Sequence, residues 1–346
     1  MALLFPLVVL ALASVHGGCA ESSSREGGPR ELPCPNAEDI SPCECTLYNT
    51  YLMTMHCSDV DNAELARVFS AHFPFTEFWH LDTRRSERLD VLREGDLGVV
   101  SFEYIDITAS GLKEVQAKAL SQSYSTVKRI GLSDNQISSF PFDELPLFTS
   151  LSQLYLYSND LDHFPQLESE YLTMVSLSFN RVSEIPVDGF KGVPNLEIFY
   201  FEGNNLRQIT PGTFAGLQRL RGLYLPNNNL NHIHQGAFET SSTSFRVLTL
   251  SSSHISSIEP NAITGLKGGE LWLDDNALTS VDEAVFRPLL EDEVQIYLEG
   301  NPLACECDIA WLVMRPELMS RIADAATCFN GQLLVDLDPA IYENLC

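Results

Sequence analysis

The chain has 346 residues, with 47 acidic and 21 basic side chains and a formal net charge of −26 at pH 7. So large an acidic excess argues against nucleic acid or an anionic membrane as a partner, because both repel negative charge. It favours a soluble protein and a partner with a basic surface. A chain of this length commonly folds as two domains, unless it is built from repeats that add up along one dimension.

The first residues of the chain have the features of a signal peptide. Residues 2–15 are almost wholly apolar but too short to span a bilayer comfortably, and Gly18, Cys19 and Ala20 supply small side chains for cleavage. We therefore predict a signal peptide over residues 1–20 and a secreted mature protein, although the run lacks an early Lys or Arg. A retained membrane anchor is the alternative. Residues 21–33, rich in Ser, Gly and charge, are expected to form a flexible lead-in.

Eight further cysteines lie in two groups of four, one near each end of the chain. They are Cys34, Cys43, Cys45 and Cys57, then Cys305, Cys307, Cys328 and Cys346. In a secreted chain such groups indicate two disulfides each, and a zinc site fits neither the spacing nor the compartment. We predict Cys-rich caps over residues 34–77 and 305–346, because the terminal coils of a repeat array expose apolar faces that must be covered.

Between the caps a pattern of apolar residues and one Asn recurs ten times, in steps of 21 to 25 residues. Its skeleton is apolar-x-x-apolar-x-apolar-x-x-Asn-x-apolar, which is the pattern and period of a leucine-rich repeat. The repeats open at Phe78, Phe102, Val127, Leu151, Leu172, Leu196, Leu220, Phe245, Gly268 and Glu293. We predict one α/β solenoid, a horseshoe with a parallel concave sheet, over residues 78–304, because each coil can bury its apolar face only against its neighbours.

Each repeat opens with a strand whose alternating apolar residues point inward, as Leu154 and Leu156 do. The Asn that follows can bond to the turn backbones of neighbouring coils, so that no buried polar group lacks a partner. These positions are Asn135, Asn159, Asn180, Asn204, Asn228, Asn276 and Asn301, with Ser110 and Ser253 in two repeats. A second apolar column is expected to fill the convex side, at Phe190, Phe214, Phe238, Ile263 and Phe286. Both columns are read as structural.

The repeat also predicts which side chains face solvent on the sheet. The central position of successive strands reads Asp82, Asp106, Gly131, Tyr155, Ser176, Tyr200, Tyr224, Thr249, Trp272 and Tyr297. Exposed Tyr and Trp on a rigid sheet are typical of protein-binding surfaces. We therefore predict a protein-binding site made of Tyr155, Tyr200, Tyr224, Trp272 and Tyr297. The alternative is that these rings only stack on one another across strands.

Charge divides this surface. Acidic groups accompany the aromatic end, at Glu202, Glu270, Asp274, Asp275 and Glu299. The first three repeats carry charges of both signs, at His80, Asp82, Arg84, Arg85, Asp106, Lys128, Arg129 and Asp134. A mixed-charge end and an aromatic, acidic end are expected.

Catalysis is not predicted. Asp82 and Asp106 occupy equivalent positions on adjacent strands, and such a pair could do acid–base work in a hydrolase, but solvated or Arg-paired carboxylates are the simpler interpretation. His232 and His234 could share a metal ion, but no third ligand is evident near them in the sequence. The chain has no phosphate-binding loop or hydrolase motif, so we expect no catalytic residue, no metal and no cofactor.

Several segments carry a more specific resemblance. They are CPNAEDISPCECTL at 34–47, DNAELARVF at 61–69, FPFDELPLFTSL at 140–151, PGTFAGL at 211–217 and GNPLACECDIAWLV at 300–313. Together they resemble secreted arthropod leucine-rich-repeat proteins of the kind found as the non-catalytic subunit of shrimp luciferase, oplophorus-luciferin 2-monooxygenase. The first cap, with eight residues between Cys34 and Cys43, is its most specific part. Thr83 and Ser86 in the first repeat, and the openings at Gly268 and Glu293, depart from the usual pattern.

The resemblance implies a secreted scaffold that performs no chemistry and associates with a smaller catalytic oxygenase subunit. It also implies disulfides from first to third and from second to fourth cysteine in each cap, which spacing alone does not decide. These pairs are Cys34–Cys45, Cys43–Cys57, Cys305–Cys328 and Cys307–Cys346. A stand-alone extracellular recognition protein, in immunity or matrix, is the alternative function.

Overall fold

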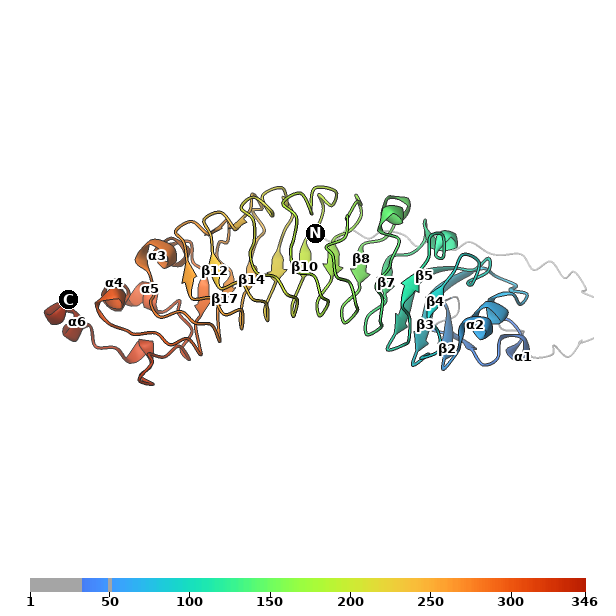
Figure 1. The fold of residues 1–346 in the computed structure, drawn as a ribbon, viewed down its shortest axis with the longest axis horizontal. Helices are drawn as coiled ribbons and strands as arrows, with labels where there is room; N and C mark the ends of the chain where they lie inside the picture. Colours follow the sequence, from blue (N-terminus) through green and yellow to red (C-terminus); the bar gives the residue numbers. More distant parts are fainter. Residues whose placement is uncertain (1–32, 49–51) are drawn as a thin grey trace, which may run out of the picture. The chain divides into compact units, whose positions relative to one another are not determined.

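In the computed structural model, which describes residues 33–48 and 52–346, the alternating apolar residues of each repeat form short strands of one twelve-stranded sheet. The coils follow one another side by side along this sheet (Figure 1). Its strands, in spatial order, are β1 (Glu44–Leu47), β2 (Met53–Ser58), β3 (Glu77–Arg84), β5 (Ser101–Thr108), β7 (Arg129–Gly131), β8 (Gln153–Tyr155), β9 (Met174–Ser176), β10 (Ile198–Tyr200), β11 (Gly222–Tyr224), β14 (Val247–Thr249), β17 (Glu270–Trp272) and β18 (Gln295–Tyr297). The predicted signal peptide and nearly all of the lead-in lie outside the described residues.

All neighbours in this sheet are parallel except β1 and β2, which pair antiparallel. Leu154 and Leu156 are fully buried, as strand alternation predicts, and so are their counterparts in the other repeats. The predicted leucine-rich-repeat solenoid with disulfide-bonded caps is confirmed.

The remaining elements are short and lie outside this sheet. Two-residue strands pair in parallel across neighbouring coils: β4 (Val91–Leu92) with β6 (Glu114–Val115), β12 (His232–Ile233) with β15 (Ser257–Ile258), and β13 (Phe238–Glu239) with β16 (Ile263–Thr264). The helices are α1 (Ala37–Ile40), α2 (Asn62–Phe69), η1 (Ser121–Ser123), η2 (Phe142–Leu147), α3 (Glu283–Glu291), η3 (Cys307–Ile309), α4 (Ala310–Val313), α5 (Pro316–Met319), η4 (Leu334–Asp336) and α6 (Pro339–Leu345). No helix in the described part of the chain is long and apolar enough to cross a membrane.

The Asn at each turn bonds to the coil on either side. The Asn180 amide donates to the carbonyl of Leu156 in the preceding coil at 2.9 Å and to Leu177 in its own coil at 3.0 Å. Its carbonyl accepts from the backbone N–H of Leu161, 3.0 Å away. Asn159, Asn204, Asn228 and Asn301 repeat this arrangement. Buried backbone groups thereby gain partners where the strand hydrogen bonds stop.

The residue before each turn Asn or Ser has a backbone conformation that the repeat pattern did not predict. In all ten repeats this residue is left-handed, with φ between 48° and 73°. The residues are Arg85, Ala109, Asp134, Ser158, Phe179, Gly203, Asn227, Ser252, Asp275 and Gly300. Two are glycine and three are Asp or Asn, which adopt this conformation readily. The other five side chains each carry roughly 1 kcal/mol of backbone strain, so the stacking of coils imposes the turn where local preference does not.

Aromatic rings fill the side of the coils that lies away from the sheet. Phe190, Phe214 and Phe238 are buried, and the rings of Phe214 and Phe238 lie 5.8 Å apart and nearly parallel. The predicted second apolar column is therefore part of the core.

Repeats nine and ten keep this core in spite of their unusual openings. Gly268 and Glu293 both adopt positive φ, at 55° and 64°, and their neighbours Leu266 and Val294 are almost fully buried. The apolar side chain has moved by one or two residues along the chain, and the turn absorbs the difference. The pairing of β14, β17 and β18 stays in register.

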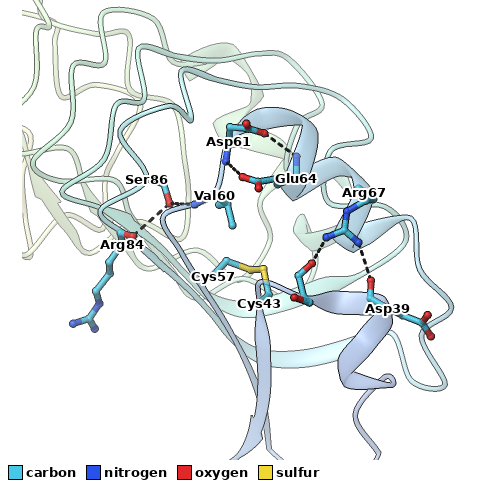
Figure 2. Close-up of a disulfide and its surroundings, with 10 residues drawn as sticks. Asp39, Cys43, Cys57, Val60, Asp61, Glu64, Arg67, Arg84 and Ser86 are labelled. Carbon is cyan, nitrogen blue, oxygen red and sulfur yellow. Dashed lines mark hydrogen bonds between the residues drawn. A yellow bond between two sulfur atoms is a disulfide. The ribbon is translucent and has the colours of Figure 1, made fainter.

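The N-terminal cap contains helix α2 and is cross-linked by the Cys43–Cys57 disulfide (Figure 2). The Asp61 carboxylate accepts from the N–H of Glu64, and the Glu64 carboxylate accepts from the N–H of Asp61, both at 2.9 Å. This capping box fixes the start of the helix. Arg67, further along α2, donates to the carbonyls of Asp39 and Ser41 beside α1.

The first repeat has Ser86 in place of the Asn, and the buried Thr83 in place of an apolar residue of the strand. The Ser86 hydroxyl accepts from the N–H of Val60 in the cap at 3.1 Å, and the Ser86 N–H donates to Ser110 at 3.0 Å. Serine therefore continues the turn network into the cap (Figure 2).

Four disulfides close the ends of the solenoid. They are Cys34–Cys45, Cys43–Cys57, Cys305–Cys328 and Cys307–Cys346. In each cap the first cysteine is joined to the third and the second to the fourth.

Candidate protein-binding surface

The register of the sheet places one residue of each strand from β2 to β18 in a single row. His56, Asp82 and Asp106 face one another across β2, β3 and β5, and each following strand adds one residue. The rest of the row is Gly131, Tyr155, Ser176, Tyr200, Tyr224, Thr249, Trp272 and Tyr297. We call this the central row. His56 lies outside the repeats, so the sequence pattern did not include it.

Two pairs of rings stack within the central row. Tyr200 and Tyr224 have ring centroids 4.6 Å apart at an interplanar angle of 20°, and Trp272 and Tyr297 lie 3.8 Å apart at 6°. All four side chains remain partly exposed. Because each ring is held against its neighbour, its free face is presented to solvent in a fixed orientation.

Further contacts on the same strands hold these aromatic side chains in place. The Trp272 indole N–H donates to Glu270 at 3.0 Å, two residues back on the same strand. The Tyr224 ring lies over Gly222, where an added Cβ would stand 2.8 Å from a ring carbon. Tyr155 stands apart from both ring pairs, and its hydroxyl lies 2.9 Å from the Met174 sulfur on the next strand.

Acidic groups line the aromatic end, as the sequence indicated. Burial raises the pKa of the Asp274 carboxyl, even though the N–H of Glu299 donates to it at 3.1 Å. Burial also raises the pKa of the Tyr224 and Tyr297 hydroxyls, and the negative charge of Glu270 adds to this in both. These hydroxyls therefore stay protonated at neutral pH and can donate hydrogen bonds.

Basic side chains stand beside the same rings. A shallow depression next to Tyr224 is lined by Ile198, Arg221, Tyr224, Ser244, Arg246 and Val247. Arg221 also pairs with Glu197 at 3.2 Å and is largely exposed. The two guanidinium groups give a partner carboxylate a place to bind within an otherwise acidic region.

The two carboxylates at the mixed-charge end are already paired with bases. Asp82 accepts from Arg84 at 2.6 Å and lies 3.2 Å from the His56 ring. Asp106 lies 2.7 Å from the His80 ring and also accepts from Arg129. Burial raises the pKa of Asp106, but His80 and Arg129 outweigh it and hold the pKa below its ordinary value. A carboxylate held in its ionised form is a poor general acid, so this pair is a charge network.

The structure places a third polar side chain beside His232 and His234. The sequence showed no third ligand, because the group that completes the set lies in the next coil. Glu259 places one carboxylate oxygen 3.0 Å from His232 Nε2 and 3.4 Å from His234 Nδ1. The three side chains together form a group able to hold a metal ion.

Comparisons with known proteins agree with the fold. The leucine-rich-repeat family pattern matches residues 170–230 and 218–268. Over 323 residues the chain is 36% identical to the oplophorus-luciferin 2-monooxygenase non-catalytic subunit of Oplophorus gracilirostris, covering 91% of this chain and 89% of that protein. The chain belongs to this family. As a leucine-rich-repeat relative of a non-catalytic subunit, it is not an enzyme.

Two further likenesses are more distant. This chain is 26% identical over 167 residues to the human leucine-rich repeats and immunoglobulin-like domains protein 3, covering 48% of this chain and 15% of that protein. A chain in the solved octameric complex of Latrophilin 3, Unc5D and FLRT2 superposes with a TM-score of 0.68 at 22% identity, covering 82% of this chain and 88% of that chain. Both show a shared fold.

Proposed function

We propose that this protein is a secreted scaffold that binds the catalytic subunit of a luciferase-type monooxygenase through the central row. The observation that carries the proposal is the 36% identity, over 91% of the chain, with a protein named as a non-catalytic subunit. The likeness covers nearly the whole length of both proteins.

The central row supports protein binding on physical grounds. Tyr200, Tyr224, Trp272 and Tyr297 offer large apolar area in fixed orientations, so little side-chain entropy is lost when a partner covers them. Tyr and Trp dominate the energetically important positions of protein interfaces for this reason. Tyr155 extends the same row by a further polar ring.

The charge of the chain indicates which kind of surface a partner would have. With a net charge of −26, and with Glu270, Asp274 and Glu299 beside the rings, the surface favours a basic partner that presents apolar side chains. Nucleic acid and anionic membranes are not expected as partners.

Secretion rests on the cysteines and on the signal peptide expected over residues 1–20. Four disulfides in the described residues require an oxidising compartment for their formation and survival.

Pull-down from the native secretion, followed by mass spectrometry, tests the proposed partner. A small oxygenase subunit recovered in a fixed ratio with this chain is the expected result. A chain that runs alone on size exclusion, without an oxygenase, would contradict it and favour a stand-alone extracellular recognition protein.

Substitution of the second ring pair tests the surface. Trp272→Ala with Tyr297→Ala should weaken the complex by about tenfold or more, since two central aromatic contacts are lost. Affinity is measured by titration calorimetry against the recovered partner. Tyr171→Ala is the matched control, because Tyr171 is 47% exposed and lies outside the sheet. Equal affinity of the double variant and the control would move the site away from the central row.

A further inference from the structure

We propose that His232, His234 and Glu259 form a binding site for a Zn²⁺-type divalent metal ion, which joins two neighbouring coils of the solenoid. The site lies on the β12–β15 strand pair, outside the twelve-stranded sheet and separate from the central row. Its function is independent of the proposed partner.

The backbone brings both imidazoles to one side. Ile233, between the two histidines, is 2% exposed, so strand alternation turns His232 and His234 outward together. Their ring centroids lie 4.4 Å apart. His232 pairs with Ser257 of β15 in the strand register, and Glu259 follows two residues later in the same coil.

The distances suit a small metal ion. One oxygen of Glu259 lies 3.0 Å from His232 Nε2 and 3.4 Å from His234 Nδ1, and all three ligand atoms lie within 4.8 Å of one another. Bonds of about 2.0–2.1 Å to zinc at tetrahedral angles place ligand atoms about 3.3 Å apart. A modest closure of the two rings would complete that geometry and leave the fourth position for water.

Contacts around the three side chains orient them as ligands. The backbone N–H of Gln235 donates to the second Glu259 oxygen at 2.7 Å, so the first oxygen faces the imidazoles. The Ser257 hydroxyl contacts His232 Nδ1, and a proton on that nitrogen leaves the Nε2 lone pair free for a metal.

The site is open to entry from solvent. The side chains of His232, His234 and Glu259 are 36%, 50% and 42% exposed. Two imidazoles and one carboxylate suit zinc better than calcium or magnesium, which prefer oxygen ligands alone.

Zinc titration of the chelator-treated full chain, in excess Mg²⁺ to occupy scattered carboxylates, tests the proposal. One saturable Zn²⁺ site per chain is expected, with a higher thermal unfolding midpoint in zinc. His234→Gln and Glu259→Gln should each weaken zinc binding by about tenfold or more, because each removes one ligand. Co²⁺ substituted for Zn²⁺ should show the intense visible absorption of a four-coordinate site.

His163→Gln is the matched control, because His163 also contacts a carboxylate, that of Asp162, at 2.6 Å. This variant should bind zinc like the parent chain. Unfolding midpoints without metal establish that each variant is folded. Absence of a saturable zinc site in the parent chain, or equal affinity in all variants, would overturn the proposal and leave the three residues as an ion-pair cluster.

Discussion

At the scale of single residues, the asparagines after the strands supply hydrogen bonds to buried backbone groups of two neighbouring coils. Asn180 is 6% exposed and bonds to four backbone groups in two coils. Its removal would leave buried N–H and C=O groups without partners, and such groups are expensive in a water-free turn.

Asn180→Ala should lower the free energy of unfolding by about 2–4 kcal/mol, since two or more buried backbone groups lose their partners. Urea denaturation followed by circular dichroism measures the change. Asn195→Ala is the control, because the exposed Asn195 amide makes one backbone bond, to Glu170 at 2.8 Å. A loss no larger than that of the control would show that water replaces the Asn180 side chain.

Charge at Asp106 predicts a pH dependence. The pKa of Asp106 is lower in the folded protein than its ordinary value of 3.8. Its charge therefore stabilises the fold at pH values above 3.8, and this stabilisation is lost as the pH falls through the lowered pKa. Asp106→Asn should therefore destabilise the protein by about 1–2 kcal/mol at pH 7, because the charge-assisted bonds to His80 and Arg129 are lost.

The same variant should lose less stability than the parent chain between pH 4 and pH 2. Urea midpoints across that range measure the effect. Parallel pH curves for the two proteins would contradict the role assigned to Asp106. Glycine at position 131 leaves room for the Asp106 carboxylate, because an added Cβ there would stand 2.1 Å from an Asp106 oxygen.

At the scale of elements, the two caps differ in how much chain each disulfide closes. Cys307 and Cys346 are separated by 39 residues, whereas Cys43 and Cys57 are separated by 14. The bond across the longer loop removes more freedom from the unfolded chain. Helices α4 and α6 pack together inside the C-terminal loop, so the disulfide closes a folded segment.

Replacing Cys307 and Cys346 together by Ser should cost about 4 kcal/mol, and replacing Cys43 and Cys57 about 3 kcal/mol, by the loop-length relation. Hydrogen exchange should show the loss first in the amides of the cap concerned, because coils contact mainly their neighbours. A uniform loss of protection across all coils would show that the solenoid unfolds as one cooperative unit.

At the scale of the whole molecule, the acidic surface acts over distances longer than any contact. A net charge of −26 attracts positively charged molecules, so the proposed basic partner would be steered toward the solenoid before it reaches the central row. Salt screens such steering, with a Debye length of about 10 Å at 0.1 M.

Raising the salt concentration from about 0.05 to about 0.5 M should therefore slow association with the partner by about tenfold or more, with little change in dissociation. Surface plasmon resonance separates the two rates. Association that is insensitive to salt would indicate that the acidic surface is only a solvated exterior.

The sequence alone determined the parts of this protein that depend on local spacing. Strand alternation and the repeat period placed Asp82 through Tyr297 in one row, and the structure has that register at every strand. The Asn positions and the buried Phe column followed from the same period, because each coil repeats the environment of the one before it.

Tertiary structure decided which side chains of neighbouring coils come into contact. Glu259 meets His232 and His234 because two coils of unequal sequence stack there, and no repeat position marks that contact. The same stacking sets the ring pairs, the bases that neutralise Asp106, and the left-handed residue before each turn. Such features depend on side-chain directions across neighbouring coils, and the period of a sequence specifies only which residues are neighbours.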